Sequence, residues 1–205
     1  YSTVEGFNPT GYNLLENTRL LSGTLDNLVS NDDKYMTFRS YASTYVTSNK
    51  GLAVYGEGTV TTPRYRIWSG SPPWGSELSA NAVTASIQWV VLVSAFTENE
   101  KILGTLSSSG DLYVQVWTGT SWTTPLLLSN VGTTIDAYRI FDIAYERVSG
   151  RALVVYNKDN LDDLRFRIWD GSSWSAENTI DTPLARIHFV DMASSPKSDN
   201  ISLII

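Results

Sequence analysis

The sequence predicts an all-β fold of the β-propeller class, built from four-stranded blades that repeat about every fifty residues. Three observations support this prediction. Aromatic residues make up 12% of the chain and charged residues only 18%, which favours β structure over disorder or a coiled coil. A W-x-G-x-x-W motif occurs three times, and apolar segments alternate with polar turns at the same spacing. With 205 residues, the chain is long enough to bury a core without disulfides.

The repeat is marked by its tryptophans. The three copies are RYRIWSGSPPW, YVQVWTGTSW and RFRIWDGSSW, and they end at Trp74, Trp122 and Trp174. The motif glycine is expected to adopt a positive φ in a tight hairpin, with the two tryptophans flanking the reversal. Alternation in the strand before the turn places Arg64, Arg66 and Trp68 on one side and Tyr65 and Ile67 on the other.

The elements follow in order along the chain. An N-terminal segment, residues 1–33, contains a candidate closing strand at 14–22, and the blades occupy residues 34–205. Three blades are complete, at 34–79, 86–128 and 137–181, and residues 186–205 supply two strands of a fourth. The first two strands of each blade are expected at 35–41 and 52–55, 89–96 and 102–106, 140–145 and 152–156, and 189–193 and 201–205.

This blade count leaves the propeller incomplete, because typical propellers have four to eight blades. We expect that the natural chain continues beyond Ile205 or, as the less favoured alternative, that neighbouring subunits complete the sheet. The last strand, with Ile201, Leu203 and Ile205, is an apolar edge that would otherwise aggregate or pair. It is therefore the predicted assembly edge, with other copies or surface proteins as partners.

A resemblance to known proteins agrees with this organisation. The stretch ALVVYNKDNLDDLRFRIWDGSSW resembles repeat units of secreted or cell-surface β-propeller proteins of bacteria and archaea. The segment GYNLLENTRLLSGTLDNLVSNDDKYMTF is similar to lead-in segments of surface-layer or appendage-type proteins. The resemblance implies a structural, adhesive or glycan-binding role outside the cell, and it carries no catalytic residue onto this chain.

Charge and composition narrow the function classes. The net charge of −6 disfavours binding to nucleic acid or to an anionic membrane surface. There is no Cys and one His, which removes thiol catalysis and disulfides, and no apolar run is long enough to span a bilayer. Abundant Thr, Ser, Asn and Tyr with few lysines favour an extracellular or cell-surface location.

Two kinds of binding site are candidates. Trp74, Trp122 and Trp174 could stack on sugar rings if they are exposed, although repeated hairpin tryptophans are also expected to pack blade against blade. The loop with Asp159, Asp162 and Asp163 offers oxygen ligands for calcium, and the alternative is an ordinary turn stabilised by Asp and Asn. No other cofactor is expected.

Catalysis has weaker support in the sequence. Glycoside hydrolysis needs two carboxylates that face one bond, and the candidates on one rim are Asp142, Glu146, Asp181 and Asp191. The Asp-box of sialidase-type propellers, S-x-D-x-G-x-T-W, is not reproduced, and His188 is expected to be a packed structural residue. The leading hypothesis is a non-enzymatic structural or adhesive module of a cell-surface layer or filament. A glycan-binding propeller is the alternative, and a propeller glycoside hydrolase is the third hypothesis.

Overall fold

The computed structural model describes residues 51–56, 59–69, 74–96, 98–130, 140–158, 164–182, 187 and 189–205. The described residues form strands, turns and loops, and none of them lies in a helix, so none belongs to a helix that could cross a membrane. Outside the described residues lie the N-terminal segment 1–33, the candidate closing strand 14–22 and the expected strand 35–41. His188 and the three candidate calcium ligands Asp159, Asp162 and Asp163 lie outside them as well.

The strands form four antiparallel sheets, which we number in chain order. Sheet 1 consists of β1 (Gly51–Tyr55), β2 (Arg64–Trp68) and β3 (Leu78–Ser79). Sheet 2 consists of β4 (Ile87–Ser94), β5 (Lys101–Ser107), β6 (Asp111–Trp117) and β7 (Leu126–Asn130). Sheet 3 consists of β8 (Phe141–Tyr145), β9 (Ala152–Asn157), β10 (Leu164–Trp169) and β11 (Asn178–Ile180). Sheet 4 consists of β12 (Asp191–Ser194) and β13 (Ile201–Ile204).

Each sheet is a meander in which consecutive strands pair, as the sequence predicts. In sheets 2 and 3 the spatial order of the four strands follows the chain. The ladders also share one register, because Gly51, Lys101 and Ala152 each face the first tryptophan of their own motif. The fifty-residue repeat therefore corresponds to one antiparallel sheet, and the all-β prediction is confirmed for the described residues.

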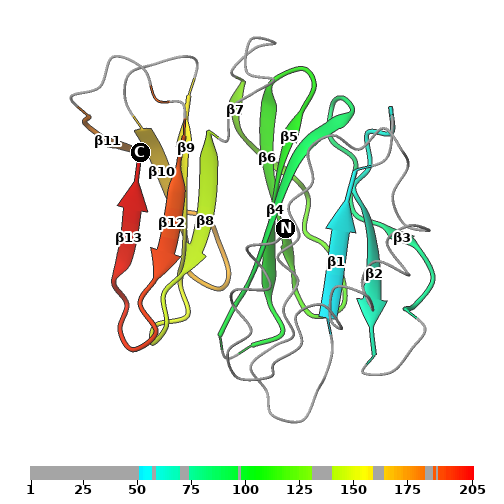
Figure 1. Ribbon diagram of the computed structural model, residues 1–205, viewed down its shortest axis with the longest axis horizontal. Helices are drawn as coiled ribbons and strands as arrows, with labels where there is room; N and C mark the ends of the chain where they lie inside the picture. The colour runs from blue at the N-terminus through cyan, green and yellow to red at the C-terminus, as the bar shows by residue number, and fades with distance from the viewer. Residues whose placement is uncertain are drawn as a thin grey trace, which may run out of the picture.

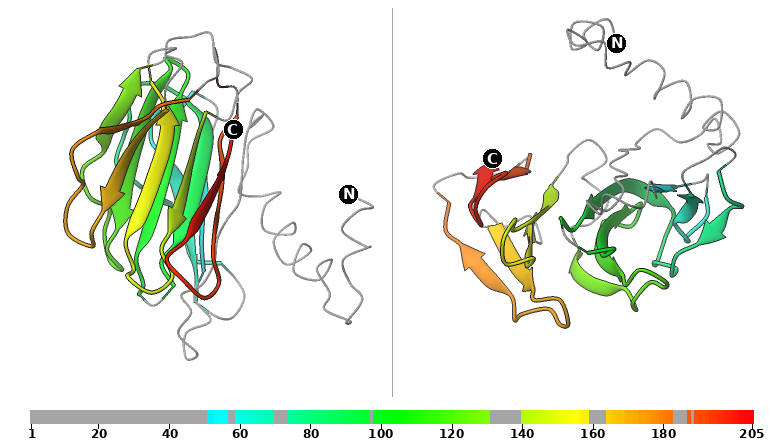
Figure 2. Two further views of the ribbon diagram at one scale, coloured as in Figure 1. Left: turned by 90° about the vertical axis from the view of Figure 1, so that its left-hand side faces the viewer. Right: turned by 90° about the horizontal axis from the view of Figure 1, so that it is seen from below.

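The sheets stand side by side and follow an arc (Figures 1 and 2). Their first strands lie next to one another, since β4 contacts β8 and β8 contacts β12. Within the described part of the chain the arc does not close into a ring (Figure 2). The arrangement agrees with successive blades, and closure of a propeller stays a prediction.

The core consists of three apolar layers, one between each pair of neighbouring sheets. The sequence of strand β4 is almost continuously apolar, and the side chains on its two faces contact different sheets. Val90 and Leu92 face sheet 1, whereas Val91 faces sheet 3. Because both faces of β4 are covered by neighbouring sheets, apolar side chains are favoured along the strand.

One glycine sets the spacing between sheets 2 and 3. A Cβ atom at Gly104 would lie 2.4 Å from Cε2 of Phe141 and 3.1 Å from Cδ1 of Ile143. No real Cβ atom tolerates the first of these distances, so sheet 3 can approach β5 this closely only because the residue has no side chain.

Candidate functional site

The paired tryptophans of the repeat form one ring contact in each of the first three sheets. The ring centroids lie 5.5 Å apart for Trp68 and Trp74, and 5.4 Å apart in each of the other two pairs. The turns in between have the expected conformation, because φ is +95° at Gly119 and +96° at Gly171. The predicted hairpin geometry is therefore confirmed for the second and third motifs.

The three candidate glycan-stacking tryptophans lie on three successive sheets and pack inward. Trp74 is only 9% exposed. Trp122 is partly buried against the layer between sheets 1 and 2, and Trp174 against the layer between sheets 2 and 3. Each of these two rings thus covers the preceding sheet, as the packing interpretation expects, and presents only part of its surface to solvent.

The second W-x-G-x-x-W motif packs against sheet 1 through aromatic contacts. The ring of Tyr65, on sheet 1, meets Trp117 at a centroid distance of 5.6 Å and Trp122 at 5.8 Å, both in edge-to-face geometry. This orientation places the positive edge of one ring against the negative face of another. Both tryptophans of the second motif therefore hold a single aromatic residue of sheet 1.

A carboxylate links sheet 2 to sheet 3. Oε1 of Glu100 accepts hydrogen bonds from Nε1 of Trp169 at 2.9 Å and from the hydroxyl of Tyr145 at 2.8 Å. Burial, followed by the charge of Glu100, raises the pKa of Tyr145 well above its usual value, so the phenol remains a donor. The repeat pattern does not predict this role, since Arg151 and Asn200 stand at the same turn position in sheets 3 and 4.

Sheet 3 carries a polar cluster on its outer strands. Glu177 accepts from the hydroxyl of Tyr156 at 2.8 Å and from Nζ of Lys158 at 2.9 and 3.1 Å, and Nε of Arg165 lies 4.0 Å away. Arg167 donates to the carbonyl oxygen of Ser175 at 2.7 Å. Burial alone would raise the pKa of Glu177, but the hydrogen bonds from Lys158 and Tyr156 lower it. The carboxylate is therefore occupied by partners of its own sheet.

Sheet 1 repeats this arrangement at equivalent positions. The Tyr55 hydroxyl donates to Glu77, and Nε of Arg64 lies 3.9 Å from the same carboxylate. Arg66 donates to the carbonyl oxygen of Gly75 at 3.2 Å. Burial, then the hydrogen bond to Glu77, raises the pKa of Tyr55 above its usual value. Of the two arginines in this motif, Arg64 thus lies against a carboxylate and Arg66 against a backbone carbonyl.

In sheet 2, different residues stand at the positions of Tyr55, Arg64, Arg66 and Glu77. Its equivalent residues are Thr105, Tyr113, Gln115 and Pro125. The buried Gln115 instead binds the segment that arrives from sheet 1, accepting from the backbone nitrogen of Asn81 at 3.0 Å and donating to its carbonyl at 2.9 Å. The Asn81 side chain then donates to the carbonyl of Thr123 at 2.9 Å. Of the exchanged residues, Gln115 therefore makes a contact between sheets 1 and 2.

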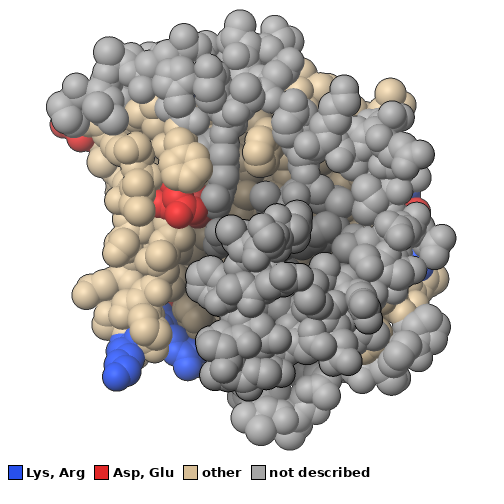
Figure 3. Space-filling view, in the orientation of Figure 1, with Lys and Arg blue, Asp and Glu red and all other residues tan. Residues whose placement is uncertain are grey.

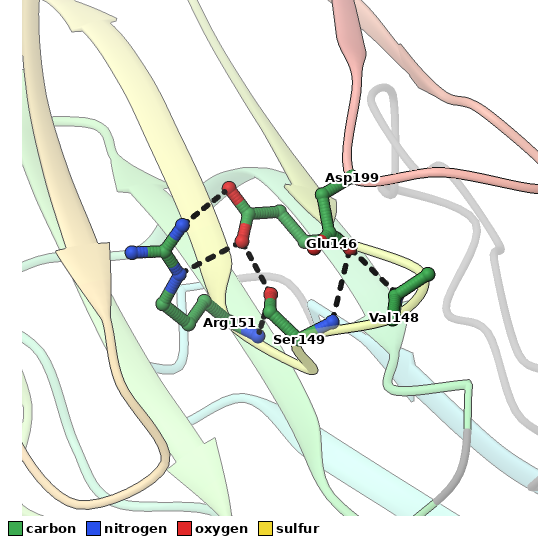
Figure 4. A network of polar contacts seen from close by, with 5 residues as sticks. All are labelled: Glu146, Val148, Ser149, Arg151 and Asp199. Carbon is green, nitrogen blue, oxygen red and sulfur yellow. Dashed lines mark hydrogen bonds and ion pairs between the residues drawn. The ribbon is translucent and has the colours of Figure 1, made fainter.

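The turns between first and second strands form a series of contacts along one rim. Glu146 pairs with Arg151 at 2.8 Å, and Oδ1 of Asp199 in sheet 4 accepts from the backbone nitrogens of Val148 at 2.6 Å and Ser149 at 3.0 Å (Figure 4). On the other side, the guanidinium of Arg147 lies 4.7 Å from the ring centroid of Phe96 in sheet 2. The turns of sheets 2, 3 and 4 thus contact one another in succession.

The candidate catalytic carboxylates differ in burial: Asp181 is exposed, Asp191 is half-buried, and the other two are bound by different partners. Asp142 is fully buried and accepts the backbone N–H of Met192 at 2.7 Å, whereas Glu146 is held by Arg151 on the rim. Asp170, in the third motif turn, accepts the backbone N–H groups of Ser172 and Ser173 at 2.8 Å each, and the hydrogen bonds from this turn lower its pKa to about 2. Within the described ranges, no cluster of three or more His, Cys, Asp or Glu residues could hold a metal ion.

The predicted assembly edge lies on β13. Among the described strands β13 pairs only with β12, with Leu203 opposite Met192. Ile201 and Leu203 face sheet 3 and are partly buried there, while Ile204 is 63% and Ile205 42% exposed. On the described surface over β12 and β13, uncharged side chains surround a patch of carboxylate (Figure 3). β13 itself carries no charged side chain, with Ile201 and Leu203 towards sheet 3 and with Ser202 and Ile204 on the other face.

Comparisons with known proteins found similar structures. No protein-family model matches the chain, and a search of curated proteins found no match either. Three-quarters of the chain (75%) aligns with an Aleuria aurantia lectin in complex with Fucalpha1-6GlcNAc, at 13% identity and a TM-score of 0.49. The same share aligns with the NanB sialidase of Streptococcus pneumoniae, at 14% identity and a TM-score of 0.46. The alignments span 48% and 24% of those two proteins.

Proposed function

We propose that the chain is a non-enzymatic module of an extracellular structural or adhesive assembly, such as a cell-surface layer or filament, and that it binds protein partners through the open edge of sheet 4. The observation that carries this proposal is β13. Its outer edge pairs with no described strand, and Ile204 projects from it with 63% of its surface exposed. An uncharged, apolar edge strand is a template for a further strand.

One further observation supports a structural role over a catalytic one, and another supports the location. The side chains that repeat from sheet to sheet, the tryptophan pairs and the Tyr–Arg–Glu sets, contact neighbouring sheets or their own sheet. The extracellular location is supported by composition, since the chain is rich in Thr, Ser, Asn and Tyr and has few lysines.

The experiment changes the edge and follows attachment to the cell. In the cells that make the protein, Ile204→Lys is expected to release it from the envelope fraction into the medium, because a charge on the edge opposes strand addition. Leu127→Lys is the matched control, since Leu127 is 47% exposed on β7 of sheet 2, away from sheet 4. An Ile204→Lys protein that stays with the envelope would overturn the proposal.

Glycan binding is the second candidate, and it rests on the tryptophans. Trp122 and Trp174 keep part of their surface open beside the exposed turn residues Ser121 and Ser173. An indole face beside hydroxyl groups suits a sugar ring. A glycan array tests this candidate, with Trp174→Ala as the control that should lose the signal, and the absence of any bound glycan retires it.

A further inference from the structure

A buried carboxylate stands at the start of β6. Asp111 is only 7% exposed, and its side chain accepts hydrogen bonds from three neutral groups. The donors are the hydroxyl of Thr84, the hydroxyl of Ser109 at 2.7 Å and Nδ2 of Asn130 at 2.5 Å. Among the described residues, no lysine or arginine forms an ion pair with Asp111. Because buried charges are paired or coordinate metal ions, this carboxylate is suited to a cation.

The oxygen atoms around Asp111 come from separate segments of the chain. Thr84 lies in the segment that leads into β4, whereas Ser107 ends β5 and Ser109 lies in the turn to β6. The Oγ atoms of Ser107 and Ser109 are 2.8 Å apart, and Oγ1 of Thr84 lies 3.4 Å from Oγ of Ser109. Calcium binds oxygen ligands at about 2.3–2.6 Å, which places neighbouring ligand atoms roughly 2.7–3.7 Å apart. These four side chains, which we call the oxygen cluster, therefore have the spacing of a calcium coordination shell.

A second observation points to the same place. Thr105 is fully buried on β5, and its hydroxyl has no hydrogen-bond partner among the described residues. Alternation along β5 places Thr105 on the same face as Ser107, and its partner Tyr113 shares that face with Asp111 on β6. A buried hydroxyl without a protein partner calls for a water molecule or an ion nearby. A calcium ion can keep water in its coordination shell, and such a water can bond to Thr105.

We propose that the oxygen cluster binds a calcium ion, with Asp111 as the charged ligand and the hydroxyl oxygens of Thr84, Ser107 and Ser109 as neutral ligands. On binding, the hydroxyl hydrogens rotate away and present oxygen lone pairs to the ion. Rotation of the Asn130 amide presents Oδ1 in place of Nδ2. The ion enters from solvent past Thr84 and Asn130, which are exposed.

The ligand set fixes the expected affinity and the effect on the fold. A site with a single carboxylate binds calcium weakly, with a Kd on the order of 10⁻⁴–10⁻³ M. The ion joins the segment between sheets 1 and 2 to the β5–β6 turn, so it should stabilise the packing of these two sheets. This inference does not depend on the proposed assembly role.

The test uses the full chain after treatment with a chelator, and calcium is the only ligand added. Calcium at about ten times its Kd should raise the Tm by about 3–6 °C, and magnesium at the same concentration should raise it less. Asp111→Asn should lose this rise, because it removes the charge and keeps a hydrogen-bond acceptor. Asp170→Asn is the matched control, since Asp170 is an exposed turn residue, and it should keep the rise. A wild-type Tm that calcium leaves unchanged would overturn the inference.

Two further measurements locate the ion. Asp163 stands six residues before the first tryptophan of its motif, as Asp111 does, so Asp163→Asn tests the calcium loop expected from the sequence. A rise in Tm that survives Asp111→Asn but is lost in Asp163→Asn would place calcium elsewhere and overturn the inference. In wild-type protein, a calcium titration followed by amide NMR should shift the signals of Ser109, Gly110 and Asp111 but leave Gly171 unchanged. Unshifted amides at residues 109–111 would overturn the inference even if Asp111→Asn fails to fold.

Discussion

The indole Nε1 of Trp169 lies 2.9 Å from Oε1 of Glu100, so the motif hairpin of sheet 3 is tied to a turn of sheet 2. The Tyr145 hydroxyl shares the same carboxylate oxygen. Neither donor can hydrogen bond to water freely, because Trp169 and Tyr145 are buried. Glu100 therefore satisfies two polar groups that the packing of the sheets removes from solvent.

Glu100→Ala should lower the free energy of unfolding by about 1–3 kcal/mol, because two buried donors lose their acceptor. Urea denaturation measures the effect. Glu98→Ala is the matched control, since Glu98 is an exposed residue of the same turn and its loss changes the net charge equally. Equal destabilisation by the two variants would mean that charge, and not the shared acceptor, is responsible.

Gly104→Ala should destabilise the protein by about 1–3 kcal/mol, because the added methyl group overlaps the ring of Phe141 and forces sheets 2 and 3 apart. Thermal and urea unfolding check the loss. In a Phe141→Leu background the same substitution should cost less, since the nearest ring atom is gone. Additive effects of the two changes would contradict the close approach.

Gln115→Arg should also destabilise, although arginine occupies the equivalent positions 66 and 167. Arginine has no acceptor for the backbone N–H of Asn81, which Gln115 now accepts at 3.0 Å. We expect a loss of about 1–3 kcal/mol. Tyr113→Arg, at the neighbouring and partly exposed position of the same set, should be milder. A fully stable Gln115→Arg protein would show that the sheets are interchangeable here.

Lys101→Met should stabilise the protein at neutral pH. Lys101 is buried, and burial lowers its pKa from 10.5 to about 8, so the folded state binds this proton less tightly than the unfolded chain. Below pH 8 the buried charge therefore costs stability in full, on the order of 1–3 kcal/mol, and the cost shrinks as pH rises from about 8 towards 10.5.

Urea titrations between pH 7 and 9.5 test the Lys101 prediction. The advantage of Lys101→Met should decrease steadily across the upper part of this range. The control is Lys197→Met, which replaces an exposed lysine and should leave the pH dependence unchanged. A constant difference between wild type and Lys101→Met would rule out a titrating buried amine.

Much of the architecture could be predicted from periodicity. The spacing of Trp68, Trp117 and Trp169 located sheets 1 to 3. Apolar runs located the first two strands of sheets 2 to 4, because both signals are local in sequence. The positive φ at Gly119 and Gly171 followed from turn chemistry for the same reason.

Contacts that occur in only one sheet could not be predicted from the sequence repeat. Glu100 acts only in one turn, and Gln115 departs from the arginine pattern to reach Asn81, which lies 34 residues away in the chain. The exposure of Trp74, Trp122 and Trp174 likewise depends on which sheet each ring covers. Such pairings are set by the packing of sheets against one another, which a single strand pattern does not encode.

The exchange of Thr105, Tyr113, Gln115 and Pro125 as a group has a consequence for how such a chain can evolve. A recombination event that duplicated or swapped the units at residues 51–79 and 152–180 would carry an intact polar set with it. The unit between them is different, because its Gln115 hydrogen bonds to Asn81 in the segment that follows β3 of the preceding unit. Recombination that moved this unit to another place in the chain would therefore separate Gln115 from Asn81 and lose this contact.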